Sequence, residues 1–200
     1  MAYLHWLLLP FSALWLLLAI KPHDRSVWLA ENVFTVATVA ALLATYERWP
    51  LSDLSYTLTV AFLVMHIIGG HYTYVRVPYD DVTHAMFGVR PNRLFGWARN
   101  HYDRLVHFAY GVLLAYPFFE LFERYAQPIG YWSYFLSPML VMATSMIFEV
   151  LEWWATEILG GGQGAAYLGA QGDEWDAQKD MALATLGSII TMGFLALYTP

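Results

Sequence analysis

The chain has 200 residues, of which 58% are hydrophobic and only 13% are charged, and its mean hydropathy is +0.44. This composition is too apolar for a soluble domain of this length, and the 9 Trp and 14 Tyr are typical of a protein with two membrane interfaces. The net charge of −6 indicates little about the outer surface, because many acids lie in motifs at the ends of apolar segments, and the lack of cysteine excludes disulfides, thiol nucleophiles and thiolate metal sites.

Six apolar segments are long enough to cross the hydrocarbon core, which takes about 20 residues. They are predicted at about Tyr3–Ile20, Val27–Tyr46, Leu54–Gly70, Asp103–Phe122, Trp132–Ile158 and Asp176–Tyr198. The first has neither the basic start nor the cleavage site of a signal peptide, so we interpret it as a retained span. The predicted fold is all-α: one integral-membrane domain, residues 1–200, with six transmembrane helices in a bundle and a polar loop at 71–102.

Basic residues concentrate in the loops that follow the first, third and fifth segments. These loops carry Lys21, Arg25, Arg76, Arg90, Arg93, Arg99, Arg104 and Lys179, whereas the opposite face has Arg48 and Arg124. The positive-inside rule therefore predicts that these three loops are cytoplasmic and that both termini lie on the other side.

Acids and histidines recur at helical spacing near the ends of the apolar segments. The motifs are Asp80-Asp81-x-x-His84, Asp103-x-x-x-His107, Glu149-x-x-Glu152 and Asp173-x-x-Asp176-x-x-x-Asp180. Residues three or four apart share a helix face, and ionisable groups are costly at membrane depth. Because helix direction alternates, the fourth, fifth and sixth segments bring their motifs to one membrane face. The sequence therefore predicts one polar site there, with Asp103/His107 and Asp176/Asp180 ranked first.

Carboxylates and imidazoles in this arrangement favour a divalent metal ion, whose identity the sequence leaves open. Helix bundles build such sites from acids and i,i+3 or i,i+4 pairs on facing helices, although the Glu-x-x-His spacing of diiron proteins is missing here. The candidate ligands are Asp103, His107, Glu149, Glu152, Asp173, Asp176 and Asp180. All of these except Asp173 are also candidate catalytic groups, since a bound metal can activate water for attack on an ester or phosphoester.

Two other interpretations of the cluster remain open. The acids can pair with Arg99, Arg104, Lys179 and the histidines in a purely structural network. Chains of Asp, Glu and His are also how transporters carry protons. The sequence alone therefore leaves an enzyme, a transporter or binding protein, and a structural network as alternatives.

The polar loop interleaves arginines with aromatic residues. Arg90, Arg93 and Arg99, together with Arg104, are candidates for binding a phosphate at headgroup level, although topology signalling and aromatic anchoring also explain them. More peripheral candidates are His66, His71, Asp80, Asp81 and His84, and the spacing of Asp80 and His84 predicts a short interfacial helix. The run Gly160-Gly161-Gly162-Gln163-Gly164 lacks the Gly-Lys-Ser/Thr of a P-loop, so we interpret it as a link.

Two longer motifs resemble a known family. The run Asn100 to Phe108, NHYDRLVHF, followed by Gly111 and Glu120, is similar to a signature of the YjdF-type inner-membrane proteins of bacteria, whose function is unknown. The run Gly169 to Met181, GAQGDEWDAQKDM, resembles that family's second signature. A weaker similarity connects the chain to VanZ-like membrane proteins, with Arg104 where their motif usually has Lys. The resemblance implies a multi-pass protein of the bacterial inner membrane and supplies no reaction.

The residues and the resemblance together predict a membrane protein with an acid and histidine cluster at one face. The first functional hypothesis is a metal-dependent enzyme, for example a hydrolase, acting on a lipid or lipid-linked headgroup. The alternative is a proton- or ion-coupled transporter or binding protein that uses the same cluster. Membrane lipids are the expected partners, and no nucleic-acid partner is expected.

Overall fold

The computed structural model describes residues 3–159 and 169–198, and all regular structure within these ranges is helical. The helices are α1 (Tyr3–Leu18), α2 (Arg25–Thr45), α3 (Asp53–His71), α4 (Tyr79–Phe87), α5 (Pro91–Phe95), α6 (Tyr102–Leu121), the π-helical turn η1 (Phe122–Ala126), α7 (Trp132–Leu159) and α9 (Asp176–Tyr198). The predicted all-α class is thus confirmed.

Five of the long helices, α2, α3, α6, α7 and α9, are long and apolar enough to cross a membrane. Helix α1 is apolar but has 16 residues, which corresponds to about 24 Å at 1.5 Å per residue. That length is less than the hydrocarbon core of about 30 Å. The prediction of six full spans is therefore confirmed for five, and the first segment is shorter than predicted.

Polar side chains just outside the apolar runs fix where the helices begin. An Asp24 carboxylate oxygen accepts hydrogen bonds from the backbone N–H groups of Ser26, at 2.8 Å, and Val27, at 3.1 Å. This N-cap starts α2 at Arg25, earlier than its apolar run suggests. Ser52 caps α3 in the same way, because its hydroxyl accepts from the backbone N–H of Ser55.

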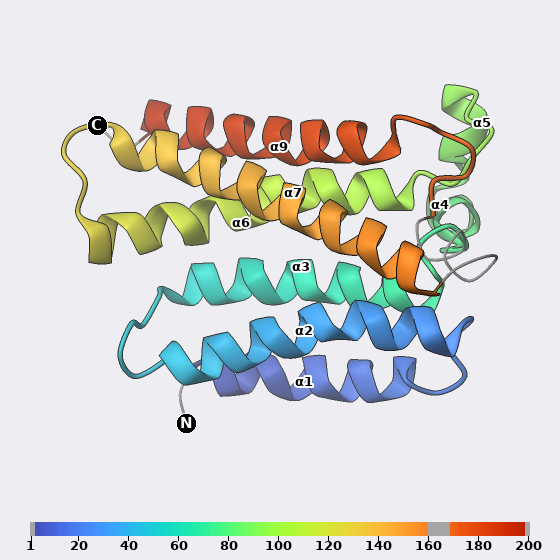
Figure 1. The fold of residues 1–200 in the computed structure, drawn as a ribbon, viewed down its shortest axis with the longest axis horizontal. Coiled ribbons are helices and arrows are strands. Elements are labelled where there is room, and N and C mark those ends of the chain that lie inside the picture. The colour runs from blue at the N-terminus through green and yellow to red at the C-terminus, as the bar shows by residue number, and fades with distance from the viewer. Residues whose placement is uncertain (1–2, 160–168, 199–200) are drawn as a thin grey trace.

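The long helices lie roughly side by side and alternate in direction, so that α1 begins and α9 ends at the same end of the bundle (Figure 1). The short helices α4 and α5 lie at the opposite end, together with the segment that leads into α9. Helix α6 is central, since it packs against α3, α7 and α9. The alternation that the sequence predicted therefore brings the start of α6, the end of α7 and the start of α9 together.

Small residues allow α6 and α9 to approach closely. A Cβ atom on Gly111 would overlap the carbonyl oxygen of Ala184, and one on Gly187 would overlap the carbonyl oxygen of Phe108. Such backbone contact is typical of small-residue interfaces between membrane helices. The Thr191 hydroxyl adds a 2.9 Å hydrogen bond to the carbonyl oxygen of Val112. This interface sets the distance between the acids of the two helices.

A buried carboxylate fastens the other end of α6. Glu120 accepts hydrogen bonds from the backbone N–H of Ser52, at 2.8 Å, and from the hydroxyl groups of Ser52 and Ser55. Arg124 pairs with it at 2.7 Å. A carboxylate at the start of α3 is also favoured by the dipole of that helix. Helix α6 is thus held against α3 at the end distant from the acid and histidine cluster.

Candidate functional site

A cavity of about 380 Å³ opens where the start of α6, the end of α7 and the start of α9 converge. Acidic residues from these helices and from the segment before α9 form most of its wall. The lining residues are Asp103, Glu149, Glu152, Ala170, Asp173, Glu174, Asp176, Ala177 and Asp180. We call this the acidic cavity. All the acids of the three motifs predicted to share a site line this cavity.

Ion pairs compensate the acids at the outer rim of the cavity. Arg99 lies 2.8 Å from Asp176, and Arg104 pairs with both Asp173 and Asp176. Lys179 lies 2.6 Å from Asp173. The hydrogen bond from Lys179, supported by one from a backbone N–H, holds the pKa of the Asp173 carboxyl well below its usual range. Ion pairs of the kind that a purely structural network would contain are therefore present at the rim of the acidic cavity.

The inner part of the cavity lacks such compensation. Asp103, His107 and Asp180 each offer a ligand atom, and these three atoms lie within 4.8 Å of one another. Asp103 Oδ1 is 3.6 Å from His107 Nε2, as expected for an i,i+4 pair on one helix face. Glu149 Oε1 approaches the same nitrogen at 3.3 Å. Within the described ranges, no Lys or Arg pairs with Asp103, Glu149 or Asp180.

Several inner carboxylate oxygens are buried without a hydrogen-bond partner among the residues described. Asp180 is 2% exposed and its Oδ1 makes no hydrogen bond with the described residues, while Glu149 is 8% exposed and its Oε1, although 3.3 Å from His107 Nε2, makes no hydrogen bond with them either. A buried carboxylate oxygen that accepts no hydrogen bond destabilises the fold by several kcal/mol, on the order of the loss of one charged hydrogen bond. A bound cation or a proton is the physical means of removing that cost.

The structure adds Glu31 of α2 to this group, which the sequence reasoning left out of the site. Glu31 is 2% exposed, its Oε2 is unpaired within the part of the chain described, and it interacts electrostatically with Asp103 and Glu152. A Cβ on Gly70 would lie 3.1 Å from the Glu31 Cβ, so the glycine makes room for this side chain. The sequence did indicate a functional role for Glu31, because it is a charged residue inside an apolar segment.

His66 also lies nearer the site than its peripheral rank suggested. Its Nε2 is 3.0 Å from the Glu31 carbonyl oxygen and 3.9 Å from the Glu31 carboxylate, and its Nδ1 is 2.5 Å from the Tyr74 hydroxyl. His71 has a structural contact instead, because its Nδ1 lies 2.7 Å from the Leu18 carbonyl oxygen. It therefore fastens the end of α3 to the end of α1.

The remaining peripheral candidates lie on α4, the short helix predicted around Asp80 and His84. Asp80 accepts a 2.8 Å hydrogen bond from the backbone N–H of Asn92, and Arg90 bonds Asp81 at 2.5 Å. These contacts hold α4 against α5. None of Asp80, Asp81 and His84 lines the acidic cavity.

The four candidate arginines divide into two pairs. Arg90 is engaged with α4, and Arg93 is exposed and makes no ion pair with the described residues. Arg99 and Arg104 lie at the rim, where Arg99 Nη2 and Arg104 Nε are buried donors without an acceptor in the described ranges. The rim can therefore accept further oxygen atoms. The glycine run 160–164 lies outside the described residues.

Comparison with known proteins agrees with the fold and the motifs. Residues 3–200 match the family described as "Predicted membrane protein (DUF2238)". The chain belongs to this family. It is also 39% identical over 179 residues to "Inner membrane protein YjdF" of Escherichia coli (strain K12). The aligned region covers 88% of this chain and 81% of that protein. No solved structure matches the chain significantly.

This family membership confirms the resemblance inferred from the two motifs. Together with the five apolar helices it identifies the chain as a multi-pass protein of the inner-membrane type. The family description names no reaction.

Proposed function

We propose that the chain is a metal-dependent hydrolase that acts on the phosphate headgroup of a lipid or lipid-linked substrate. The observation that carries this proposal is the contrast inside the acidic cavity. Asp173 and Asp176 at the rim are matched by Arg99, Arg104 and Lys179, whereas the inner carboxylates have no basic partner among the described residues except histidine. Uncompensated acids at membrane depth are best explained by a bound cation.

Asp103, His107 and Asp180 are the proposed metal ligands. Their donor atoms lie within 4.8 Å of one another, which allows all three to approach one ion after small side-chain rotations. A mixed carboxylate and imidazole set suits zinc, iron or manganese and fits magnesium or calcium less well. A divalent cation held there would polarise a phosphoryl oxygen and supply a nucleophilic water near neutral pH.

Arg99 and Arg104 are the proposed phosphate-binding residues. Both are partly buried at the rim, with exposed side-chain fractions of 14% and 18%, and each keeps a buried N–H donor without an acceptor in the ranges described. Guanidinium groups bind phosphate through paired charge-assisted hydrogen bonds. Their pairing with Asp173 and Asp176 fixes their position beside the inner carboxylates.

Glu149 is the proposed general base. Its unpaired Oε1 lies in the cavity wall 3.3 Å from His107 Nε2, next to the proposed ligands. It takes a proton from water as the water oxygen bonds to phosphorus. The phosphorus–oxygen bond to the leaving group then breaks, and the leaving oxygen takes a proton from solvent at the rim.

Phosphate or headgroup release by the purified chain in lipid nanodiscs tests this proposal. A panel of phospholipids and lipid-linked phosphates is incubated with Mn²⁺ or Zn²⁺, with and without a chelator. We expect metal-dependent release by the wild type and a loss of about 100-fold or more in Asp180→Asn and Glu149→Gln. Glu157→Gln, an exposed acid near the end of α7, is the matched control and should retain activity. Release that is equal in all four proteins would contradict the proposed chemistry.

A second candidate function is proton- or ion-coupled transport through the same cluster. The observation that favours it is the second acid and imidazole contact, between Glu31 and His66, which lies close enough to Asp103 and Glu152 to interact with them. Such a series resembles a proton relay. In proteoliposomes this alternative predicts no hydrolysis but a proton flux that Glu31→Gln lowers.

A further inference from the structure

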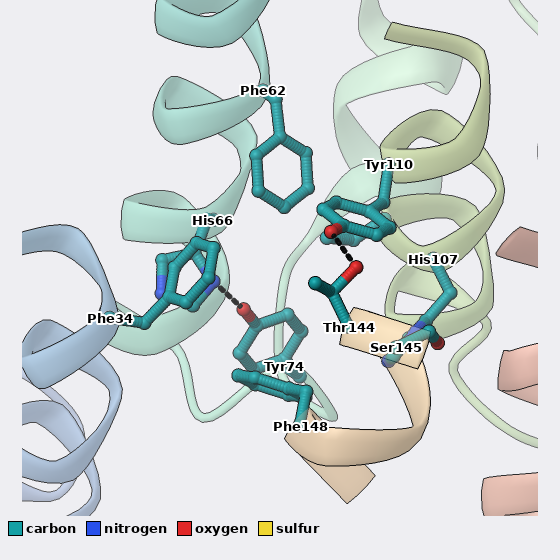
Figure 2. Close-up of a pocket in the computed structure, with 10 residues that line it drawn as sticks. Phe34, Phe62, His66, Tyr74, His107, Tyr110, Thr144, Ser145 and Phe148 are labelled. Atoms are coloured by element: carbon teal, nitrogen blue, oxygen red, sulfur yellow. Dashed lines mark hydrogen bonds between the residues drawn. The ribbon is translucent and has the colours of Figure 1, made fainter. Parts of the chain in front are cut away.

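A second cavity, of about 400 Å³, adjoins the acidic cavity and lies deeper in the bundle. Figure 2 shows its wall, which α2, α3, α6 and α7 build together with Tyr74. Most of the wall is aromatic or apolar, including Phe34, Phe62, Tyr110 and Phe148. We call this the aromatic cavity.

Most polar groups in this wall are already hydrogen-bonded to the protein. The Tyr74 hydroxyl donates to His66 Nδ1, and the Tyr110 hydroxyl is 2.6 Å from the Thr144 hydroxyl oxygen (Figure 2). Burial, and then the charge of Glu31, raise the pKa of Tyr74 well above its usual range, so its hydroxyl remains a donor. The Ser145 hydroxyl is the buried polar group of this wall without a partner in the described ranges. The cavity therefore suits a mainly apolar ligand.

His107 connects the two cavities. It lines the aromatic cavity, while its Nε2 lies 3.3 Å from Glu149 and 3.6 Å from Asp103 in the wall of the acidic cavity. From Asp103 to Tyr110 along α6 the depth increases by about 10 Å at 1.5 Å per residue. A polar compartment near the membrane face thus lies next to an apolar compartment nearer its centre, with His107 between them. The polar and then apolar cavities follow the same order as the headgroup and hydrocarbon chain of a lipid whose headgroup lies at the membrane face.

The aromatic cavity borders a seam between α2 and α7. Helix α2 packs mainly against α3, and α7 packs mainly against α6 and α9. The two helices meet at Phe34 and Phe148, whose ring centroids are 5.9 Å apart. Their outer faces are apolar and exposed, as at Val36, 52%, and Ile147, 52%. The contact between these two rings therefore lies between the cavity and the exposed apolar faces of α2 and α7.

We propose that the aromatic cavity binds a hydrocarbon chain of the lipid whose phosphate headgroup lies in the acidic cavity, and that the chain enters between α2 and α7. The assignment of the headgroup rests on the proposed function, whereas the chain site rests on the aromatic wall and the seam. The substrate class is therefore a phospholipid or lipid-linked phosphate with its hydrocarbon chain intact.

Native mass spectrometry of the detergent-purified protein with added dioleoyl phosphatidylglycerol tests the chain site. Ser145→Phe places a ring in the cavity, and Met146→Phe places the same ring on the exposed, lipid-facing side of α7 as a matched control. We expect a roughly tenfold or greater loss of retained lipid in Ser145→Phe, because the ring displaces several buried methylene groups. Met146→Phe should retain lipid like the wild type. Equal retention in the two variants overturns the proposal.

A second measurement covers the case in which Ser145→Phe fails to fold. Because the chain has no cysteine, Ser145→Cys introduces a single thiol, which methyl methanethiosulfonate modifies at a measurable rate. Dioleoyl phosphatidylglycerol should slow this reaction, and glycerol 3-phosphate, which has the headgroup but no chain, should leave it unchanged. An equal rate with and without the phospholipid overturns the chain site.

Metal binding separates this proposal from the proposed function. Mn²⁺ binding should be unchanged in Ser145→Phe and weakened at least roughly tenfold in Asp180→Asn, while Asp180→Asn should still retain lipid. If the wild type binds no metal but Ser145→Phe still loses lipid, the proposed hydrolase is wrong and the chain site is supported.

Discussion

Asp173 and Asp180 belong to one sequence motif but have opposite surroundings. Asp173 accepts hydrogen bonds from Lys179 and Arg104, whereas Asp180 is 2% exposed, with an oxygen that lacks a partner in the described residues. Spacing on a helix predicts which residues share a face, but not which neighbour each side chain meets. The division into a compensated rim and an uncompensated interior could therefore not be predicted from the motif.

The low pKa of Asp173 predicts a pH-dependent contribution to stability. Its hydrogen bonds favour the ionised form in the folded state, so the stabilisation is present above the ordinary carboxyl pKa of about 3.9. It is lost as the pH falls through the lower folded value. Asp173→Asn should therefore lower the melting temperature at pH 7, and the difference from wild type should shrink below about pH 4.

Thermal unfolding followed by circular dichroism in detergent checks this prediction. Glu174→Gln is the control, because Glu174 is an exposed neighbour without an ion pair in the ranges described. A wild type and an Asp173→Asn variant with the same melting temperature at pH 7 would show that the rim network contributes nothing to stability.

Helices α6 and α9 determine the geometry of the acidic cavity. Gly111 and Gly187 bring the two backbones into contact, and this contact places Asp103 and His107 of α6 beside Asp180 of α9. Gly111 could be singled out in the sequence, because it follows the NHYDRLVHF run of the first family signature. Its partners on α9 could not be identified, since an apolar helix offers many faces of similar hydropathy.

Adding one methyl group to this interface should separate the helices. In Gly111→Ala the new Cβ overlaps the Ala184 carbonyl oxygen, and relief of such overpacking typically costs about 1–3 kcal/mol of unfolding free energy. Gly193→Ala on α9 is the control, because nothing lies within 4 Å of its added Cβ. The melting temperature should fall in the first variant and remain the same or rise slightly in the second. Similar melting temperatures in both would contradict the close approach.

Helix boundaries were more predictable than helix neighbours. The predicted segment Asp176–Tyr198 is α9 itself, and Trp132–Ile158 differs from α7 by one terminal residue. Apolar length sets these limits directly. Larger differences occur at α2, which begins at Arg25 and not at Val27, and at α1, which ends at Leu18 and not at Ile20.

At the scale of the whole molecule, alternating helices bring polar groups to one end of an apolar bundle. Helices α2, α3, α6, α7 and α9 each place an acid or imidazole there, and Arg99, before α6, and Arg104, in its first turn, lie at the rim. Helix direction predicted the convergence of the motifs on α6, α7 and α9, but not the contribution of Glu31 on α2. The aromatic cavity behind it was not predictable, because its wall comes from aromatic residues scattered over four helices.

The most direct test of this account is a titration of the purified wild-type protein with Mn²⁺, followed by electron paramagnetic resonance. The wild type should bind Mn²⁺, and Asp180→Asn should weaken binding at least roughly tenfold, equivalent to about 1.4 kcal/mol. Asp53→Asn, an exposed acid at the opposite end of the bundle, should bind like the wild type. The same weak affinity in all three proteins would contradict a metal site in the acidic cavity.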